Sequence, residues 1–135
     1  MTTIIATITI RRGDTFSQAL LDLGVITNYT HLDFTVKEAK GDLDSEAIIH
    51  IRKSASGLKD GLLVLNGETG TASEGSITID DAPSGDITIA LAAGATEHLD
   101  RAVLFYDVQK IVGTTVTTMG EGICIIEADI GRAIV

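Results

Sequence analysis

AVLFYDVQKIVGTTVTTMGEGICIIEAD, residues 102–129, is the stretch that decides the fold. Two runs rich in Val, Ile and Leu lie on either side of a short polar turn. Alternation of side chains with a period of two is typical of β-strands, and two such runs around a short turn predict a hairpin. Phe105 and Tyr106 lie within it, in a chain that has only three Phe and two Tyr. We therefore expect this hairpin to lie at the centre of the core.

Successive side chains on a strand point to opposite faces of the sheet, so the hairpin has two faces. If one face packs in the core, its residues are Leu104, Tyr106, Val108, Cys124 and Ile126. The opposite face then carries a second apolar set, which we call the apolar stripe: Val103, Phe105, Ile123 and Ile125. An exposed apolar patch commonly marks an association site. The stripe is therefore predicted to contact another subunit, unless the N-terminal strand or residues 92–99 cover it within the chain.

The composition indicates a single all-β domain that spans residues 1–135. A chain of 135 residues has the length of one domain. Aromatic residues make up 4% and Trp is absent, so the core must be built from Ile, Val, Leu and Ala. The β-branched residues among these favour strands.

Short alternating segments continue through the rest of the chain. The expected strands are Thr3–Arg11, Thr15–Leu23, His31–Lys37, Ala47–Lys53, Leu62–Asn66, Ser76–Asp80 and Asp86–Leu91. Residues 92–99 break the alternation and predict one helical turn, and residues 66–75 read as a flexible polar turn. About eight or nine short strands with frequent turns are typical of an antiparallel β-sandwich, and one longer crossing segment suits a Greek-key order.

Two of these strands show which residues should face the core. His31–Lys37 alternates most cleanly, with apolar residues at even positions and polar residues at odd positions. In Ala47–Lys53 two phases are open: either Ile49 and Ile51 face inward with His50 outward, or the phase is reversed.

The charge and the cysteine content exclude several classes of protein. The formal net charge is −9, and phosphate binding depends on clusters of Lys and Arg, so nucleic acid is not expected as a partner. The N-terminal MTTIIATITIRR alternates and has no basic leader, so neither a signal peptide nor a membrane partner is predicted. Cys124 is the only cysteine, so the fold is expected to lack a disulfide, as in a reducing cytoplasm.

The residues that could carry chemistry are scattered along the chain. His31, His50 and His98 fall on separate segments, and Cys124 lies in an apolar strand, so no zinc-site spacing is present. No Gly-x-Ser-x-Gly elbow and no phosphate-binding loop occur. We therefore predict no catalytic residues, no metal site and no cofactor, and the chain is not expected to be an enzyme.

Two acidic segments are weaker candidates for binding a cation. One is the connection 38–46, whose acidic side chains lack the spacing of a twelve-residue calcium loop. The other surrounds the turn at Asp80, Asp81 and Asp86. Solvated loops are the favoured interpretation of both segments.

Four short segments occur in an order that resembles a known family. They are Ile8–Phe16, Ile26–Thr30, Phe105–Gln109 and Gly122–Arg132. Together they resemble a family of bacteriophage and prophage tail or baseplate proteins with an immunoglobulin-like fold, similar to the N-terminal domain of upper baseplate proteins. Asn28 stands where the family pattern has Gly, and residues 53–75 have no counterpart.

The resemblance implies an antiparallel immunoglobulin-like β-sandwich with a structural, non-enzymatic role in a tail, a baseplate or another virion-associated part. It also implies other virion or tail proteins as partners, a homo-oligomer, and a place in the virion after assembly in the host bacterial cytoplasm. The alternative is a carbohydrate-binding or adhesive β-sandwich module. That reading needs exposed aromatic rings, and the chain offers only Tyr29 and Tyr106 as tyrosines and no Trp.

Overall fold

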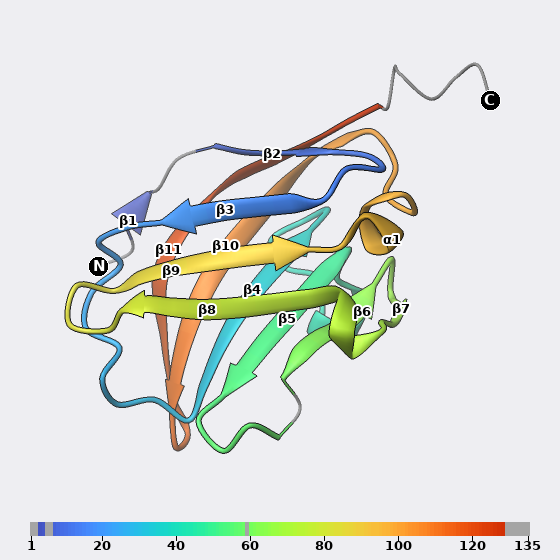
Figure 1. The fold of residues 1–135 in the computed structure, drawn as a ribbon. Coiled ribbons are helices and arrows are strands. Elements are labelled where there is room, and N and C mark those ends of the chain that lie inside the picture. The colour runs from blue at the N-terminus through green and yellow to red at the C-terminus, as the bar shows by residue number, and fades with distance from the viewer. Residues whose placement is uncertain (1–2, 5–6, 59, 129–135) are drawn as a thin grey trace.

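The structure, a computed structural model, describes residues 3–4, 7–58 and 60–128. These residues form two β-sheets, which we call the large sheet and the small sheet, and one short α-helix. Figure 1 shows the small sheet in front of the large sheet, which curls behind it with its strands crossing at a steep angle. The predicted β-rich class is therefore confirmed.

The large sheet contains eight strand segments. In spatial order seven of them are β1 (Thr3–Ile4), β11 (Thr115–Glu127), β10 (Ala102–Val112), β4 (His31–Lys37), β5 (Ile49–Ser54), β6 (Gly61–Leu65) and β7 (Glu68–Thr69). The eighth, β2 (Ile8–Arg11), also pairs with β11. The small sheet has the order β3 (Phe16–Leu20), β9 (Asp86–Leu91) and β8 (Gly75–Asp81).

Strands β10 and β11 form the long antiparallel hairpin that was predicted from residues 102–129. Their pairing runs from Ala102 opposite Ile126 to the tip, with one irregularity after Val108. At the tip Gly113 has a φ of 61°, which glycine adopts without a steric penalty. Asp129, the last residue of the predicted hairpin, lies outside the described residues.

The inward face of the hairpin is built around Tyr106. The centroid of its ring lies 5.7 Å from that of Phe34 on β4. Gly122 lies opposite Tyr106, and a Cβ at this position would come within 2.8 Å of the tyrosine ring. Glycine therefore makes room for the ring. Burial, with a smaller contribution from Cys124, raises the pKa of Tyr106 to about 12.

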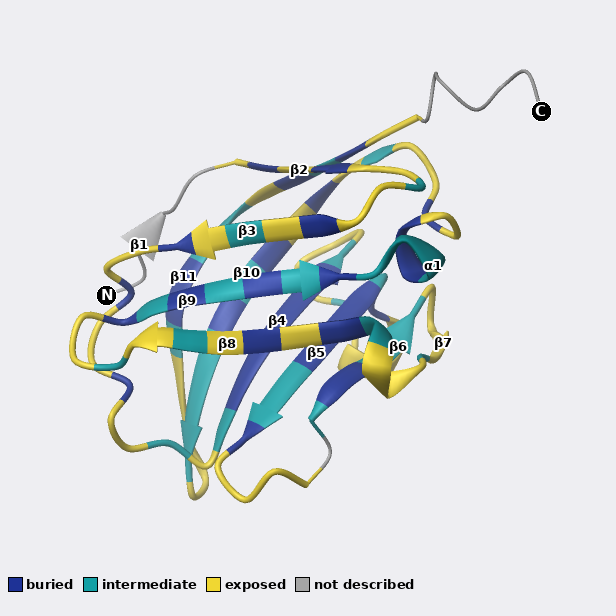
Figure 2. Ribbon diagram, in the orientation of Figure 1, coloured by how far each residue is buried: buried dark blue, intermediate teal, exposed yellow. Residues whose placement is uncertain are grey.

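The core lies between the two sheets, and Figure 2 shows buried residues along the strands of both. The largest fully buried side chains are Phe34, Ile8, Ile10, Ile26, Leu32, Ile49, Ile51, Leu62, Ile87, Ile89, Leu91 and Leu99. Nearly all are Ile or Leu, as the composition predicts, and burial of such surface is the main stabilising term. Because Ile49 and Ile51 face inward, the first of the two phases open for β5 is correct.

The large sheet is mixed, so the prediction of a purely antiparallel fold is wrong. Strand β1 runs parallel to β11, with Thr3 opposite Gly120, and β2 does the same, with Ile8 opposite Cys124. Parallel neighbours cannot be joined by a tight hairpin, and here nearly the whole chain separates the two partners. The strand predicted over Thr3–Arg11 corresponds to β1 and β2, with residues 5–6 outside the described residues.

The strand predicted over Thr15–Leu23 ends early, at the end of β3. Asp22 takes a φ of 59°, which interrupts the extended backbone. The backbone amides of Asp22 and Leu23 form hydrogen bonds with the β8–β9 turn. Asp22 N donates to Asp86 Oδ1 at 3.0 Å, and Leu23 N donates to Gly85 O at 3.1 Å. Pairing with this turn therefore replaces pairing within the small sheet.

Short helical segments join several strands: α1 (Ala93–Thr96), and the 3₁₀ turns η1 (Asp44–Glu46) and η2 (Ala72–Glu74). Helix α1 lies within the predicted segment 92–99, whereas η1 and η2 were not predicted. Strand β7 and η2 also replace half of the flexible turn expected over 66–75. Thr96 Oγ1 donates to Asp14 O at 2.7 Å and accepts from Gly13 N at 3.1 Å, which ties α1 to the β2–β3 turn.

Candidate protein interface

The apolar stripe lies on the outer face of the large sheet, on the β10–β11 hairpin. Val103 pairs directly with Ile125, and Phe105 pairs with Ile123, so the four side chains are cross-strand neighbours. Val103 is 68% exposed, Ile123 42% and Phe105 38%, while Ile125 is partly buried. The predicted assignment of the two faces is confirmed, because the opposite face is buried: Leu104, Tyr106, Val108, Cys124 and Ile126.

In the described residues, neither segment that was considered as a cover lies over the stripe. Strand β2 is placed beside β11 within the large sheet, and α1 follows β9 of the small sheet. Three of the four stripe residues remain exposed in the part of the chain that the structure describes. The stripe is therefore apolar surface facing away from the small sheet.

Lys40, in the connection between β4 and β5, borders the stripe. Its Nζ lies 5.4 Å from the centre of the Phe105 ring, within the range of a cation–π interaction. The same ammonium is 4.0 Å from Glu121 Oε1. The Lys40 side chain is 67% exposed, so the solvent screens both interactions.

A hollow of about 180 Å³ opens beside the stripe. It is lined by Thr35, Lys37, Lys40, Phe105, Tyr106, Asp107 and Glu121. Burial raises the pKa of the Asp107 carboxyl; Lys37 opposes this shift, and nearby carboxylates such as Asp44 add to it. The hollow therefore holds a carboxylate that is poorly stabilised in its ionised form.

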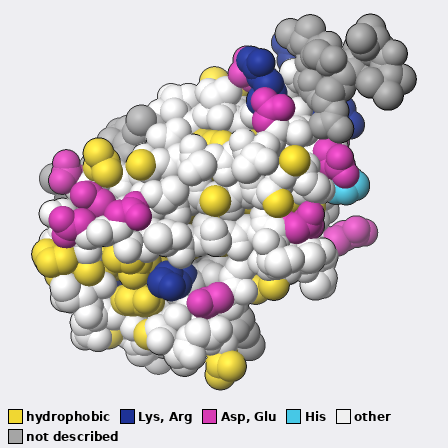
Figure 3. Space-filling model, viewed as in Figure 1, with side chains coloured by type: hydrophobic (Ala, Val, Ile, Leu, Met, Phe, Trp, Pro, Cys, Tyr) yellow, Lys and Arg dark blue, Asp and Glu magenta, His cyan; other side chains and the backbone are white. Residues whose placement is uncertain are grey.

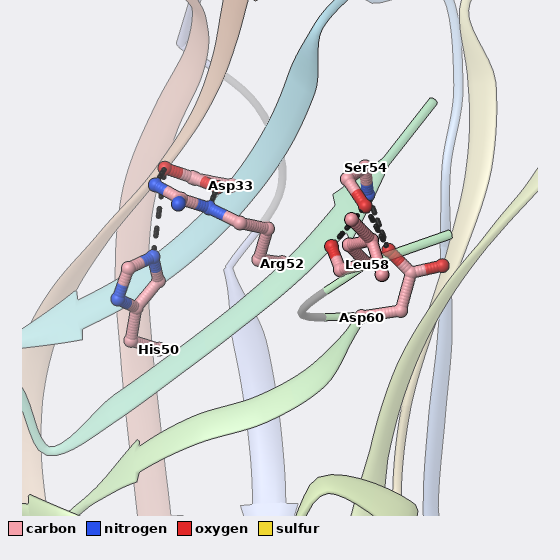
Figure 4. Close-up of polar contacts among 6 residues, drawn as sticks. All are labelled: Asp33, His50, Arg52, Ser54, Leu58 and Asp60. Carbon is pink, nitrogen blue, oxygen red and sulfur yellow. Dashed lines mark hydrogen bonds and ion pairs between the residues drawn. The ribbon is translucent and has the colours of Figure 1, made fainter. Parts of the chain in front are cut away.

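Further from the hairpin, the same outer face carries a buried ion network on β4 and β5, drawn in Figure 4. Arg52 donates two hydrogen bonds to Asp33, from Nε to Oδ1 at 2.8 Å and from Nη2 to Oδ2 at 2.9 Å. His50 Nε2 lies 3.5 Å from Asp33 Oδ2. Burial disfavours the ionised form of Asp33, but His50 and Arg52 outweigh it and lower its pKa to about 2.

The burial of this polar region was not predicted. Alternation places Asp33 and Thr35 opposite the core-facing residues, and that placement is correct, but Asp33 is only 2% exposed and Thr35 is also buried. The β4–β5 connection reaches this side of the sheet, since Lys37 Nζ lies 2.8 Å from Asp44 on η1. A signal was present in the sequence, because Asp33 and Arg52 become direct cross-strand neighbours once β4 pairs with β5.

The histidines are less isolated than the sequence predicts, because two of them lie close to a carboxylate. His50 does approach Asp33, but His98 is an exposed side chain 3.7 Å from Glu97. Burial raises the pKa of the Cys124 thiol to about 12, which keeps it protonated and unreactive. Within the described ranges, no group of three or more His, Cys, Asp or Glu side chains is arranged to hold a metal ion. That the chain is not an enzyme stays a prediction.

The acidic turn between β8 and β9 uses its carboxylates in local hydrogen bonds. Thr88 Oγ1 donates to Asp80 Oδ2 at 2.6 Å, and Ser84 N donates to Asp81 Oδ1 at 3.2 Å. These contacts hold the hairpin turn in place.

Comparison of the chain with known proteins finds no matching family model and no match among curated proteins. Among the described helices, none is both long enough and apolar enough to cross a membrane.

Proposed function

We propose that the chain is a non-enzymatic structural component of a bacteriophage or prophage particle, placed in the tail, the baseplate or another virion-associated part. It acts through protein contacts, with further copies of itself and with other virion or tail proteins as partners. The observation that carries the proposal is the exposed apolar stripe on the β10–β11 hairpin. Such a patch is unfavourable in water, and the free energy falls when another surface covers it.

The strand order supports an immunoglobulin-like sandwich. Variable-type immunoglobulin domains add strands C′ and C″ to the sheet formed by G, F and C, and hold B, E and D in the other sheet. The order β11-β10-β4-β5-β6 in the large sheet and β3-β9-β8 in the small sheet follow this arrangement when the strands are lettered along the chain. We include a Greek-key connection in the proposal on the same ground.

Three departures separate the chain from antibody domains. The antibody disulfide between the sheets has no counterpart, since Cys124 is the only cysteine, and the buried Trp is also missing. Strands β1 and β2 pair with β11 of the large sheet. Ile and Leu packing between the sheets takes the place of the disulfide and the Trp.

The segments that resemble phage tail and baseplate proteins support the particle assignment. Ile8–Phe16 spans β2, the following turn and the start of β3, and Ile26–Thr30 leads into β4. Phe105–Gln109 lies in β10, and Gly122–Arg132 begins in β11, with residues 129–132 outside the described part. The first and last segments are neighbours, because β2 pairs with β11. Assembly would take place in the host bacterial cytoplasm.

The alternative, a carbohydrate-binding or adhesive module, finds less support. Stacking on sugar rings needs exposed aromatic faces, and the Tyr106 ring is buried in the core. Tyr29 is partly buried against the core. The exposed Phe105 lies within the stripe, beside the Lys40 ammonium.

Molecular mass in solution tests the proposed interface. The wild-type chain is expected to associate, and Phe105→Ser and Ile125→Ser are expected to weaken association, because each replaces buried apolar contact by a hydroxyl. Light scattering after size-exclusion chromatography measures the mass. A monomeric wild type, or variants that associate unchanged, would show that the stripe is not the interface.

Val103→Ser and Val25→Ser form a matched pair for this experiment. Both valines are exposed, Val103 in the stripe and Val25 in the connection between β3 and β4. Only Val103→Ser is expected to lower the mass. Equal effects of the two substitutions would point to a general change in solubility.

A further inference from the structure

Lys40 is held only loosely at the border of the apolar stripe. Its ammonium is 4.0 Å from Glu121 Oε1 and 5.4 Å from the centre of the Phe105 ring. Ion pairs of this length on an exposed side chain contribute little to stability. The ammonium is therefore available to a stronger partner.

Asp107 lies in the adjoining hollow, and none of the ion pairs among the described residues includes its carboxylate. Within residues 3–4, 7–58 and 60–128, Lys37 is the cation whose charge acts on this carboxylate, and its effect is smaller than that of burial. Lys37 lines the same hollow, but its Nζ pairs with Asp44 at 2.8 Å. Burial raises the pKa of Asp107, as expected for a partly buried carboxylate in this position. A cation brought to the hollow from outside the chain would stabilise the ionised form.

Both lysines and acidic residues line the hollow, although the chain as a whole is acidic. Lys37 and Lys40 line it together with Asp107 and Glu121, whereas the chain has a net charge of −9. On the opposite side of the molecule, Asp and Glu side chains gather at both ends of the face shown in Figure 3. Two copies that approach through the hollow therefore bring lysines of one copy near acidic residues of the other, whereas approach through the face in Figure 3 brings acidic groups together.

We propose that two copies of the chain pair through this face around a two-fold axis, with Lys40 of each copy reaching Asp107 of the other. In a two-fold interface both copies use the same patch, so each contact occurs twice. Both residues adjoin Phe105: Lys40 lies over its ring, and Asp107 follows it on the same face of β10. This inference rests on the proposed function, because it specifies the partner of the stripe.

Exchange of charge between the two residues tests the contact. Lys40→Glu places an acid opposite Asp107 of the second copy, and Asp107→Lys places a cation opposite Lys40. Each protein alone is expected to associate about tenfold more weakly than the wild type, or weaker still, because like charges face each other twice. Mixed in equal amounts, the two proteins are expected to form hetero-pairs about as tightly as the wild type, since both contacts again join opposite charges. Sedimentation velocity with one protein fluorescently labelled measures both quantities.

Lys53→Glu and Glu68→Lys are the matched control pair. They change the net charge by the same amounts but lie on β5 and β7, outside the residues that line the hollow. These controls are expected to associate as the wild type does, alone and mixed. A mixture of Lys40→Glu and Asp107→Lys that associates no better than either protein alone would overturn the contact.

A neutral variant still tests the contact if the charge-exchanged proteins misfold. Asp107→Asn keeps the size of the side chain and is expected to weaken wild-type pairing several-fold, so unchanged pairing would also overturn the contact.

The proposed interface and the Lys40–Asp107 contact would fail in different ways. If stripe variants weaken association but charge exchange gives no rescue, only the Lys40–Asp107 contact is wrong. If stripe variants associate unchanged, the proposed interface itself is wrong.

Discussion

The outer face of the large sheet has two regions in which polarity and exposure are reversed. On β10 and β11, the apolar side chains of Val103, Phe105 and Ile123 are exposed. On β4 and β5, the polar side chains of Asp33 and His50 are buried. Both regions belong to one continuous face, because β4 pairs with β10.

The difference lies in where each region finds its contacts. The polar region finds its main contacts inside the chain, since Arg52 donates two hydrogen bonds to Asp33. His50 Nε2 lies 3.5 Å from the same carboxylate and has no hydrogen bond within the described residues. The stripe has no comparable cover in the described part of the chain. A buried polar network rigidifies the sheet. Exposed apolar surface contributes to stability only when association removes it from water. We therefore expect the β10–β11 region, and not the polar region, to bind another protein surface.

The largest expected effect comes from removing the centre of the polar region. Asp33→Ala should lower the free energy of unfolding by about 3 kcal/mol, because it leaves the Arg52 guanidinium without its buried counter-charge and removes the carboxylate beside His50. Urea unfolding at neutral pH, in dilute solution, measures this change. Val103→Ser in the stripe should change the same quantity by no more than about 0.5 kcal/mol. Similar losses in the two variants would remove the distinction between the two regions.

A change of pH should separate the same two regions more gently. The pKa of Asp33 is about 2 in the folded chain against an ordinary 3.8. As the pH falls, the unfolded chain therefore binds this proton before the folded chain does. Ionised Asp33 contributes about 2 kcal/mol to the free energy of unfolding above about pH 4, and this contribution is lost as the pH falls toward 2. Urea unfolding of the wild type and Asp33→Asn across this range should show their difference shrinking. A difference that stays constant down to pH 2 would contradict the ionised network.

The smallest expected effect concerns Asp107, whose pKa shift has the opposite sign. Because burial raises its pKa, the folded chain holds this proton more readily than the unfolded chain, and its contribution to stability falls as the pH rises through its titration. Asp107→Asn should therefore leave the free energy of unfolding at neutral pH unchanged or slightly raised, whereas Asp33→Asn should lower it. The same urea experiment compares them. A loss at Asp107→Asn as large as that at Asp33→Asn would mean that both carboxylates already have their partners within the chain.

The β10–β11 hairpin and its two faces were predictable from the sequence, because the alternation of Cβ directions follows directly from strand geometry. The same alternation holds in the β8–β9 hairpin, where Ile77, Ile87 and Ile89 are buried and Ile79 is partly buried against the core. Local turn signals and apolar periodicity suffice where the partner strand is the next one along the chain.

The parallel edge of the large sheet and the buried polar region were not predictable in this way. The pairing of Ile8 with Cys124 joins the two ends of the chain, and no local pattern specifies the partner of an edge strand. Alternation assigns Asp33 to a face but not its exposure, which depends on the curl of the sheet and on the β4–β5 connection. Burial of a charged residue is tolerated here only because Arg52 arrives opposite Asp33 from the next strand.

Intermolecular contacts of the stripe are the most direct test of the account. In a mixture of isotope-labelled and unlabelled chains, isotope-filtered NMR detects nuclear Overhauser effects only between different copies. We expect such effects at the methyl groups of Val103 and Ile125, and none at those of Val25. Effects confined to other surfaces, or a chain that stays monomeric at the concentrations of the experiment, would contradict the assignment of the stripe as the interface.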